Sequence, residues 1–90
     1  MKRITVAIMP FITFQHIYVL QNKELIHDCE CTIDELSEIL YAVAKEYDVH
    51  DIEFLGTPKF NTKLKEEIEK DCVTKYDNYQ LNITLVGGKD

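Results

Sequence analysis

Thiol and imidazole side chains that alternate along one segment are the first candidate for chemistry. His27, Cys29 and Cys31 are each two residues apart, so in a β-strand their side chains point to one face. Such a set is able to supply three zinc ligands, with Cys72 or His16 as a fourth. The specific zinc motifs, however, place cysteines across a turn, whereas alternate residues of a strand lie roughly 7 Å apart. We therefore prefer cysteines that act as small buried apolar residues, and predict neither a metal ion nor a cofactor.

Acidic residues around the expected start of a helix are the second candidate. Paired carboxylates are able to hold Mg²⁺ or to transfer protons. Those on the helix fall opposite its apolar stripe, where solvent and the helix dipole account for them without chemistry. We predict no catalytic residue among these acids, which instead form a candidate face for a protein partner: Asp28, Glu30, Asp34, Glu35 and Glu38.

The turn Gly56-Thr57-Pro58-Lys59 is the third candidate, because it lies between an expected strand and an expected helix, where α/β proteins often bind anions. It has one glycine and lacks the Gly-Lys-Ser/Thr ending of a phosphate loop. A structural turn, with Thr57 or Asn61 capping the helix, is the preferred interpretation. Gly56, Thr57 and Lys59 remain the best candidate site for a small molecule or an anion.

The elements that must position these residues follow from hydrophobic periodicity. The clearest is a helix in which apolar residues recur at three- and four-residue spacing, preceded by Thr32 and Glu35 in the spacing of a capping box. A Lys- and Glu-rich segment with a narrow apolar seam predicts a second helix, and short apolar or alternating segments predict strands. In order, we expect strands at 4–9, 14–20 and 24–31, a helix at 33–47, a strand at 51–55, a helix at 60–71 and a strand at 79–86.

The pattern of apolar residues also predicts which side chains are buried. The strand 4–9 is almost continuously apolar, which is typical of a strand covered on both faces. Five aromatic residues are expected in the core: Phe11, Phe14, Tyr18, Tyr41 and Phe60. If Phe11, Ile12 and Phe14 are instead exposed, they form an apolar patch suited to a partner.

The order β-β-β-α-β-α-β predicts one α/β domain over residues 1–90, a mixed sheet with two helices against it, with its core at about 3–86 and a flexible tail at 87–90. This order resembles the ribonuclease H-like fold, which nucleases of that class share with actin-like ATPase domains. The resemblance is one of topology, from Ile4 to Val86. It implies a metal-binding aspartate in the first strand, and for the actin-like phosphate loops a Gly-rich hairpin as well.

This chain departs from both patterns. The strand 4–9 contains no acid, and the hairpin 11–15 is bulky rather than Gly-rich. The two-metal or nucleotide chemistry of those families is therefore not expected, because a shared fold does not transfer function.

Composition limits the remaining function classes. With 46% apolar and 29% charged residues, the 90-residue chain has the composition of an ordinary globular domain. Its net charge of −6 is concentrated in residues 24–53, which carry ten acids against one lysine. The lack of a basic stripe argues against a nucleic-acid partner. No apolar segment approaches the ~18 residues of a membrane span, and three cysteines, an odd number, indicate free thiols in the cytoplasm.

The sequence thus predicts a non-catalytic accessory or interaction protein, bacterial or phage-encoded. We expect it to bind another protein or its own copy, through the acidic face of residues 24–53 or the edge of the strand 79–86. Two alternatives belong to other classes: a degenerate metal-dependent nuclease that uses the acids of residues 28–38, and a binder of a small molecule or an anion at residues 56–59.

Overall fold

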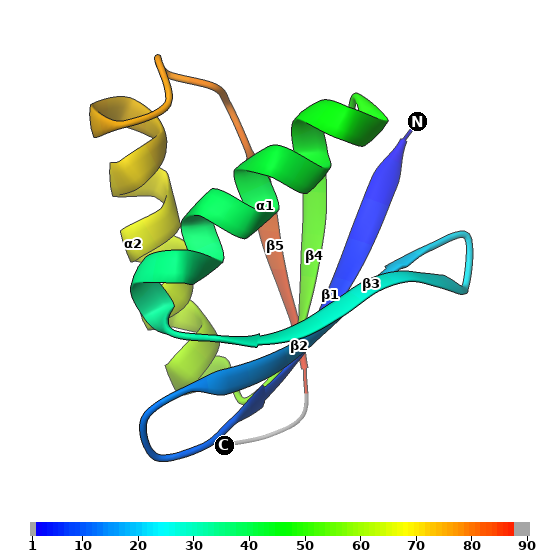
Figure 1. Cartoon of the computed structure of the whole chain (residues 1–90), viewed down its shortest axis with the longest axis vertical. Coiled ribbons are helices and arrows are strands. Elements are labelled where there is room, and N and C mark those ends of the chain that lie inside the picture. Colours follow the sequence, from blue (N-terminus) through cyan, green and yellow to red (C-terminus); the bar gives the residue numbers. More distant parts are fainter. Residues whose placement is uncertain (1, 88–90) are drawn as a thin grey trace.

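The computed structural model describes residues 2–87 as one mixed sheet with two helices (Figure 1). The expected order β-β-β-α-β-α-β is confirmed. The elements are β1 (Arg3–Pro10), β2 (Gln15–Gln21), β3 (Glu24–Cys31), α1 (Ile33–Tyr47), β4 (Asp51–Gly56), α2 (Pro58–Thr74) and β5 (Asn82–Gly87).

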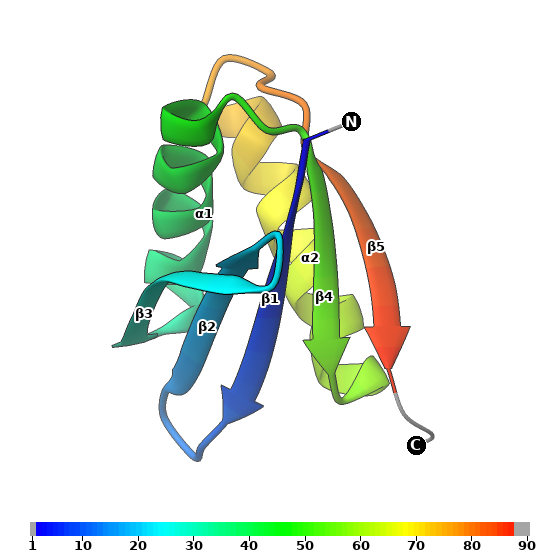
Figure 2. The same cartoon turned by 90° about the vertical axis from the view of Figure 1, so that its right-hand side faces the viewer.

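The sheet has the strand order β3-β2-β1-β4-β5. The first three strands form an antiparallel meander, whereas β4 is parallel to β1 and β5 is parallel to β4. The two crossovers through α1 and α2 run in the same direction across the sheet. Because such crossovers are right-handed, both helices lie on the same face, and no helix of residues 2–87 covers the opposite face (Figure 2).

One-sided coverage corrects the expectation that β1 is buried on both faces. Ile4, Val6 and Ile8 face the helices and are buried, but Met9 on the other face is 51% exposed. The cause lies in the crossovers rather than in the strand: an apolar strand is covered on both faces only when helices reach both sides of the sheet.

The core is mainly aliphatic, which corrects a second expectation. Of the five aromatic residues expected inside, Phe11 is 50% exposed and the other four are half-buried. Phe54 is the aromatic side chain that is fully buried. It lies on β4, between β1 and β5, where both helices contribute apolar residues to the same cluster, such as Leu40 and Leu64.

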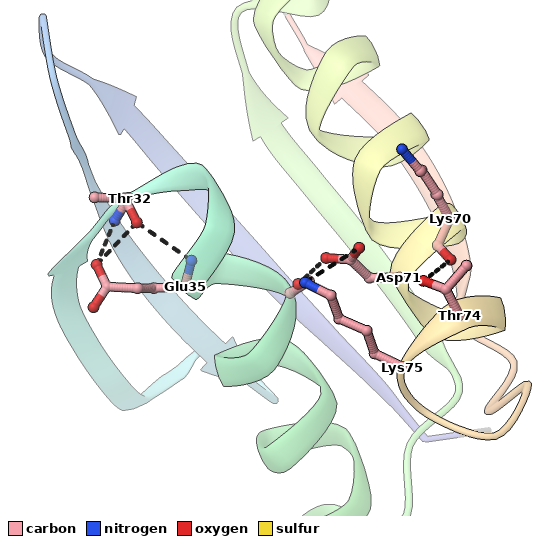
Figure 3. A network of polar contacts seen from close by, with 7 residues as sticks. Thr32, Glu35, Lys70, Asp71, Thr74 and Lys75 are labelled. Atoms are coloured by element: carbon pink, nitrogen blue, oxygen red, sulfur yellow. Dashed lines mark hydrogen bonds and ion pairs between the residues drawn. The ribbon is translucent and has the colours of Figure 1, made fainter.

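Helix α1 begins and ends with recognisable caps. The Thr32 hydroxyl accepts a hydrogen bond from the Glu35 backbone N–H at 3.3 Å, and the Glu35 carboxylate accepts one from the Thr32 N–H at 2.9 Å (Figure 3). This is the expected capping box. At the other end, Asp48 adopts the left-handed conformation and its N–H donates to the carbonyl groups of Ala44 and Lys45.

Helix α2 is longer than the expected 60–71. It begins at Pro58, which suits a first helical position because its missing N–H has no partner there anyway. The expected side-chain cap is absent at Thr57, and Asn61 is buried rather than capping. Inside the molecule, the Ser37 hydroxyl of α1 donates to the Asp71 carboxylate of α2 at 2.6 Å, which ties the two helices together.

Strand β5 begins at Asn82, three residues later than expected. The preceding residues instead form a turn in which Asp77 and Asn78 have positive φ angles, and the Asn78 N–H donates to the Cys72 carbonyl group at 2.8 Å. At its other end, β5 finishes with Gly87; the remainder of the expected flexible tail, residues 88–90, lies outside the described residues.

The described part of the chain, residues 2–87, has no helix of the length and apolar character needed to cross a bilayer.

Candidate functional site

The alternating thiols lie on the helix side of β3, with burial that increases along the strand. His27 is exposed, Cys29 is half-buried, and Cys31 is buried and accepts a hydrogen bond from the Gln15 amide at 3.4 Å. Burial raises the pKa of the Cys31 thiol to about 11, and also raises that of Cys29. Metal ligation requires thiolates. Within residues 2–87, no three His, Cys, Asp or Glu side chains converge as metal ligands.

The acids of the candidate partner face are divided between two surfaces. Glu30 and Asp28 pair across the sheet with His16 and Tyr18, and so lie on the face without helices. There the Asp28 carboxylate lies 3.2 Å from the His16 imidazole. The other three acids lie on α1: Asp34, Glu35 and Glu38, all exposed.

Glu35 has a structural role in the capping box. Two hydrogen bonds from Thr32 lower the pKa of the Glu35 carboxyl group; the bond from the backbone N–H has the larger effect and the bond from the hydroxyl the smaller one. Asp28 and Glu30 therefore lie on a different surface from Asp34, Glu35 and Glu38.

The turn at Gly56 has a steric cause. Gly56 adopts a φ of +143°, and a Cβ atom there would lie 2.9 Å from the Ile8 carbonyl oxygen. Below it, Asn61 is 2% exposed, and its Oδ1 has no hydrogen-bond partner among residues 2–87. Thr57 and Lys59 line a cleft beside this turn, whereas Gly56 borders a separate, smaller hollow on the open face of the sheet.

A groove between α2 and β5 is a feature that the sequence did not predict. Its volume is about 430 Å³. Helix α2 contributes one ridge, made of Lys65, Glu69, Cys72 and Val73, and the floor comes from residues 81–84. Val73 is 63% exposed, so the groove offers apolar surface to solvent. The sequence did contain a signal for this ridge: its residues are spaced by three, four or seven positions along α2, so they lie on one face of the helix.

The end of the groove is held in place by polar contacts of the turn before β5. The Tyr79 hydroxyl donates to the Val49 carbonyl group at 3.2 Å. The Nδ1–H of His50 donates to the Gln80 carbonyl group at 2.8 Å, and the His50 ring stacks on that of Tyr79 with centroids 4.8 Å apart. These contacts fix the turn against the start of β4, so the groove wall is preformed.

The two edges of the sheet differ in how they are protected against pairing. Edge strand β3 carries three acids and an irregular register opposite Val19 and Leu20, features that discourage another strand from adding. Edge strand β5, Asn-Ile-Thr-Leu-Val-Gly, contains no charged residue and no proline. Its Leu85 and Val86 side chains are 37% and 40% exposed. The unprotected edge is therefore the one beside the groove.

Comparison with known proteins identifies the fold. No protein-family model matches the sequence, and no curated protein matches it significantly. A crystal structure from Bacteroides thetaiotaomicron, of a protein with an actin-like ATPase fold and unknown function, is similar with a TM-score of 0.50 and 15% identity. The similarity covers 90% of this chain and 32% of that one, so this chain spans about a third of its structural relative. The chain therefore has a small α/β fold of the ribonuclease H-like type that includes actin-like ATPase domains.

Proposed function

We propose that this protein is a non-catalytic interaction module that binds an extended segment of another protein along β5. The observation that carries the proposal is the open, uncharged edge of β5 beside a preformed groove. An extended segment that adds to such an edge gains main-chain hydrogen bonds, and its alternate side chains enter the neighbouring groove. The segment expected here has apolar residues at alternate positions, because Val73 and Cys72 line the groove.

Charge favours a different protein over a second copy as the occupant. Each copy carries a net charge of −6, so two copies repel each other at low ionic strength, while a basic partner is attracted. The groove itself offers both signs, with Lys65 and Glu69 on its ridge. The acids of residues 24–53 attract a basic partner from a distance and so accelerate its association with the protein. They do this without forming one contact surface. Free thiols at Cys29, Cys31 and Cys72 support a reducing compartment, the cytoplasm.

The test begins with peptides selected from a displayed library on the wild-type protein. Val86→Lys places a charge on the β5 edge, and Val73→Asp places one in the groove. Both wild-type side chains are exposed, so the fold tolerates the changes. Leu25→Lys is the matched control, since Leu25 is 54% exposed on the opposite edge strand. We expect binding to weaken at least tenfold in the first two variants and to stay unchanged in the control.

Amide hydrogen exchange locates the bound segment. Strand addition pairs backbone groups that face solvent in the free protein, so amides in residues 82–87 become protected when the peptide is present. Protection in β3 instead, or equal binding by Val86→Lys, overturns the proposal. A homodimer in analytical ultracentrifugation that Val86→Lys dissociates shows that a second copy is the occupant and also overturns it.

A further inference from the structure

A second cavity lies at the end of the molecule where β1 and β4 finish. Its volume is about 470 Å³, within the ~300–1,000 Å³ typical of small-molecule sites. Three parts of the chain form it: the β1–β2 turn, the first residue of α1 and the first turns of α2. None of its lining residues belongs to the groove along β5.

The walls of this cavity are apolar and aromatic. The β1–β2 turn is closed by a hydrogen bond from the Phe11 N–H to the Phe14 carbonyl group at 2.8 Å, and the two rings stack with centroids 4.8 Å apart. Ile12 at the tip is fully exposed, and Ile33 at the start of α1 is 43% exposed. Phe60 of α2 completes the wall. These side chains leave apolar area in water that an apolar ligand would bury.

The charged groups of the cavity all have one sign. Among the described residues 2–87, its lining contains Lys59 and Lys63 and no acid. The two lysines are four residues apart on α2, so they share one face of the helix. Neither forms an ion pair within residues 2–87. In a chain with a net charge of −6, an apolar cavity with two unpaired lysines is complementary to an apolar molecule that ends in a negative charge.

We propose that this cavity binds a medium-chain carboxylate, a free molecule with an apolar chain and one carboxylate group. The chain lies against Phe11, Ile12 and Phe60, and the carboxylate lies near Lys59 and Lys63. Flexible lysine stems cover apolar surface while the ammonium groups stay in water, which suits a ligand that is apolar at one end and charged at the other.

Decanoate and decanol are the probes, because they share a chain and differ in charge. Both are titrated below the micellar concentration and followed by chemical shifts of the labelled protein. We expect saturable decanoate binding with shifts at residues 11–15 and 57–63, and decanol binding that is about three- to tenfold weaker. Raising the ionic strength weakens decanoate binding and leaves decanol binding unchanged.

Two variants separate the charge from the apolar wall. Lys59→Gln combined with Lys63→Gln brings decanoate affinity down to that of decanol. The matched control, Lys70→Gln combined with Lys75→Gln, removes the same charge at the other end of α2, outside both the cavity and the groove, and leaves the affinity unchanged. Ile12→Asn weakens both probes, and since Ile12 is fully exposed the urea midpoint stays the same.

Four results overturn the proposal: no saturable binding, equal affinity for the two probes, equal losses in the two double variants, or shifts elsewhere on the surface. Vesicles of phosphatidylglycerol test the other source of an anionic amphiphile. Sedimentation with these vesicles in the absence of decanoate binding shows that the apolar end recognises a lipid surface, and also overturns binding of the free carboxylate.

Discussion

Removal of the Ser37 hydroxyl tests the packing of the two helices that form one wall of the molecule. Ser37 is 2% exposed in the middle of α1, and its hydroxyl donates to the Asp71 carboxylate of α2 at 2.6 Å. Asp71 also lies 3.8 Å from the ammonium group of Lys75. The Asp71 side chain is 13% exposed, so this polar contact sits at the rim of the apolar core. Ser37→Ala removes the donor and leaves the carboxylate with Lys75 and little water.

The magnitude follows from the kind of bond. A hydrogen bond to a charged group contributes about 1.5–3 kcal/mol. Alanine is a better helix former than serine, which returns about 0.5 kcal/mol. The expected net loss in the free energy of unfolding is therefore about 1–2.5 kcal/mol, which lowers the melting temperature of a domain of this size by roughly 4–20 °C.

Urea denaturation followed by circular dichroism measures this loss. Thr74→Ala is the matched control: its hydroxyl donates to the Lys70 carbonyl group at 3.0 Å on the exposed side of α2, and its removal costs less than about 0.5 kcal/mol (Figure 3). In a double-mutant cycle with Asp71→Ala, we expect a coupling energy above about 1 kcal/mol. Strict additivity, or equal losses for Ser37→Ala and Thr74→Ala, would refute the assigned role of this bond.

Two further predictions concern ionisable groups. Hydrogen bonds from Thr32 lower the pKa of the Glu35 carboxyl group from its ordinary value of 4.5. The ionised carboxylate therefore stabilises the fold fully above pH 4.5, and this stabilisation is lost as the pH falls through the lower pKa of the folded protein. The difference in urea midpoint between wild type and Glu35→Ala should shrink in acid, and a constant difference would contradict this. Burial raises the pKa of Cys31 from 9.0 to about 11, so the unfolded chain loses its proton first, and stability should fall as the pH rises from 9 towards 11. Cys31→Ala should remove that part of the alkaline decline, and mass spectrometry should find Cys31 unmodified by iodoacetamide at neutral pH until the protein unfolds.

Local signals in the sequence were sufficient to predict which segments form helices and strands. The capping box of Thr32 and Glu35 and the periodicity after it determine α1 to the residue, because both act within a few residues along the chain. The boundaries of α2 and β5 were less accurate. Pro58 is compatible with either a turn or a first helical position, and the turn at Asp77 and Asn78 depends on contacts with the end of α2.

The candidate surfaces depended on tertiary structure. The hand and direction of the two crossovers place both helices of the described chain on one face of the sheet. As a result β1 is covered on one side, and Asp28 and Glu30 lie away from the acids of α1. The groove along β5 needs the α2 ridge and the edge strand side by side, and the cavity at Phe11 needs three segments far apart in the chain.

Sequence alone thus determined which segments are helices and strands and that Phe11 and Ile12 were candidates for an exposed patch, since these follow from local periodicity and composition. Only the tertiary structure decided which apolar side chains stay in water, which strand edge is unprotected and which lysines border a cavity. Those properties arise from the packing of distant segments, and residue spacing along the chain does not encode them separately.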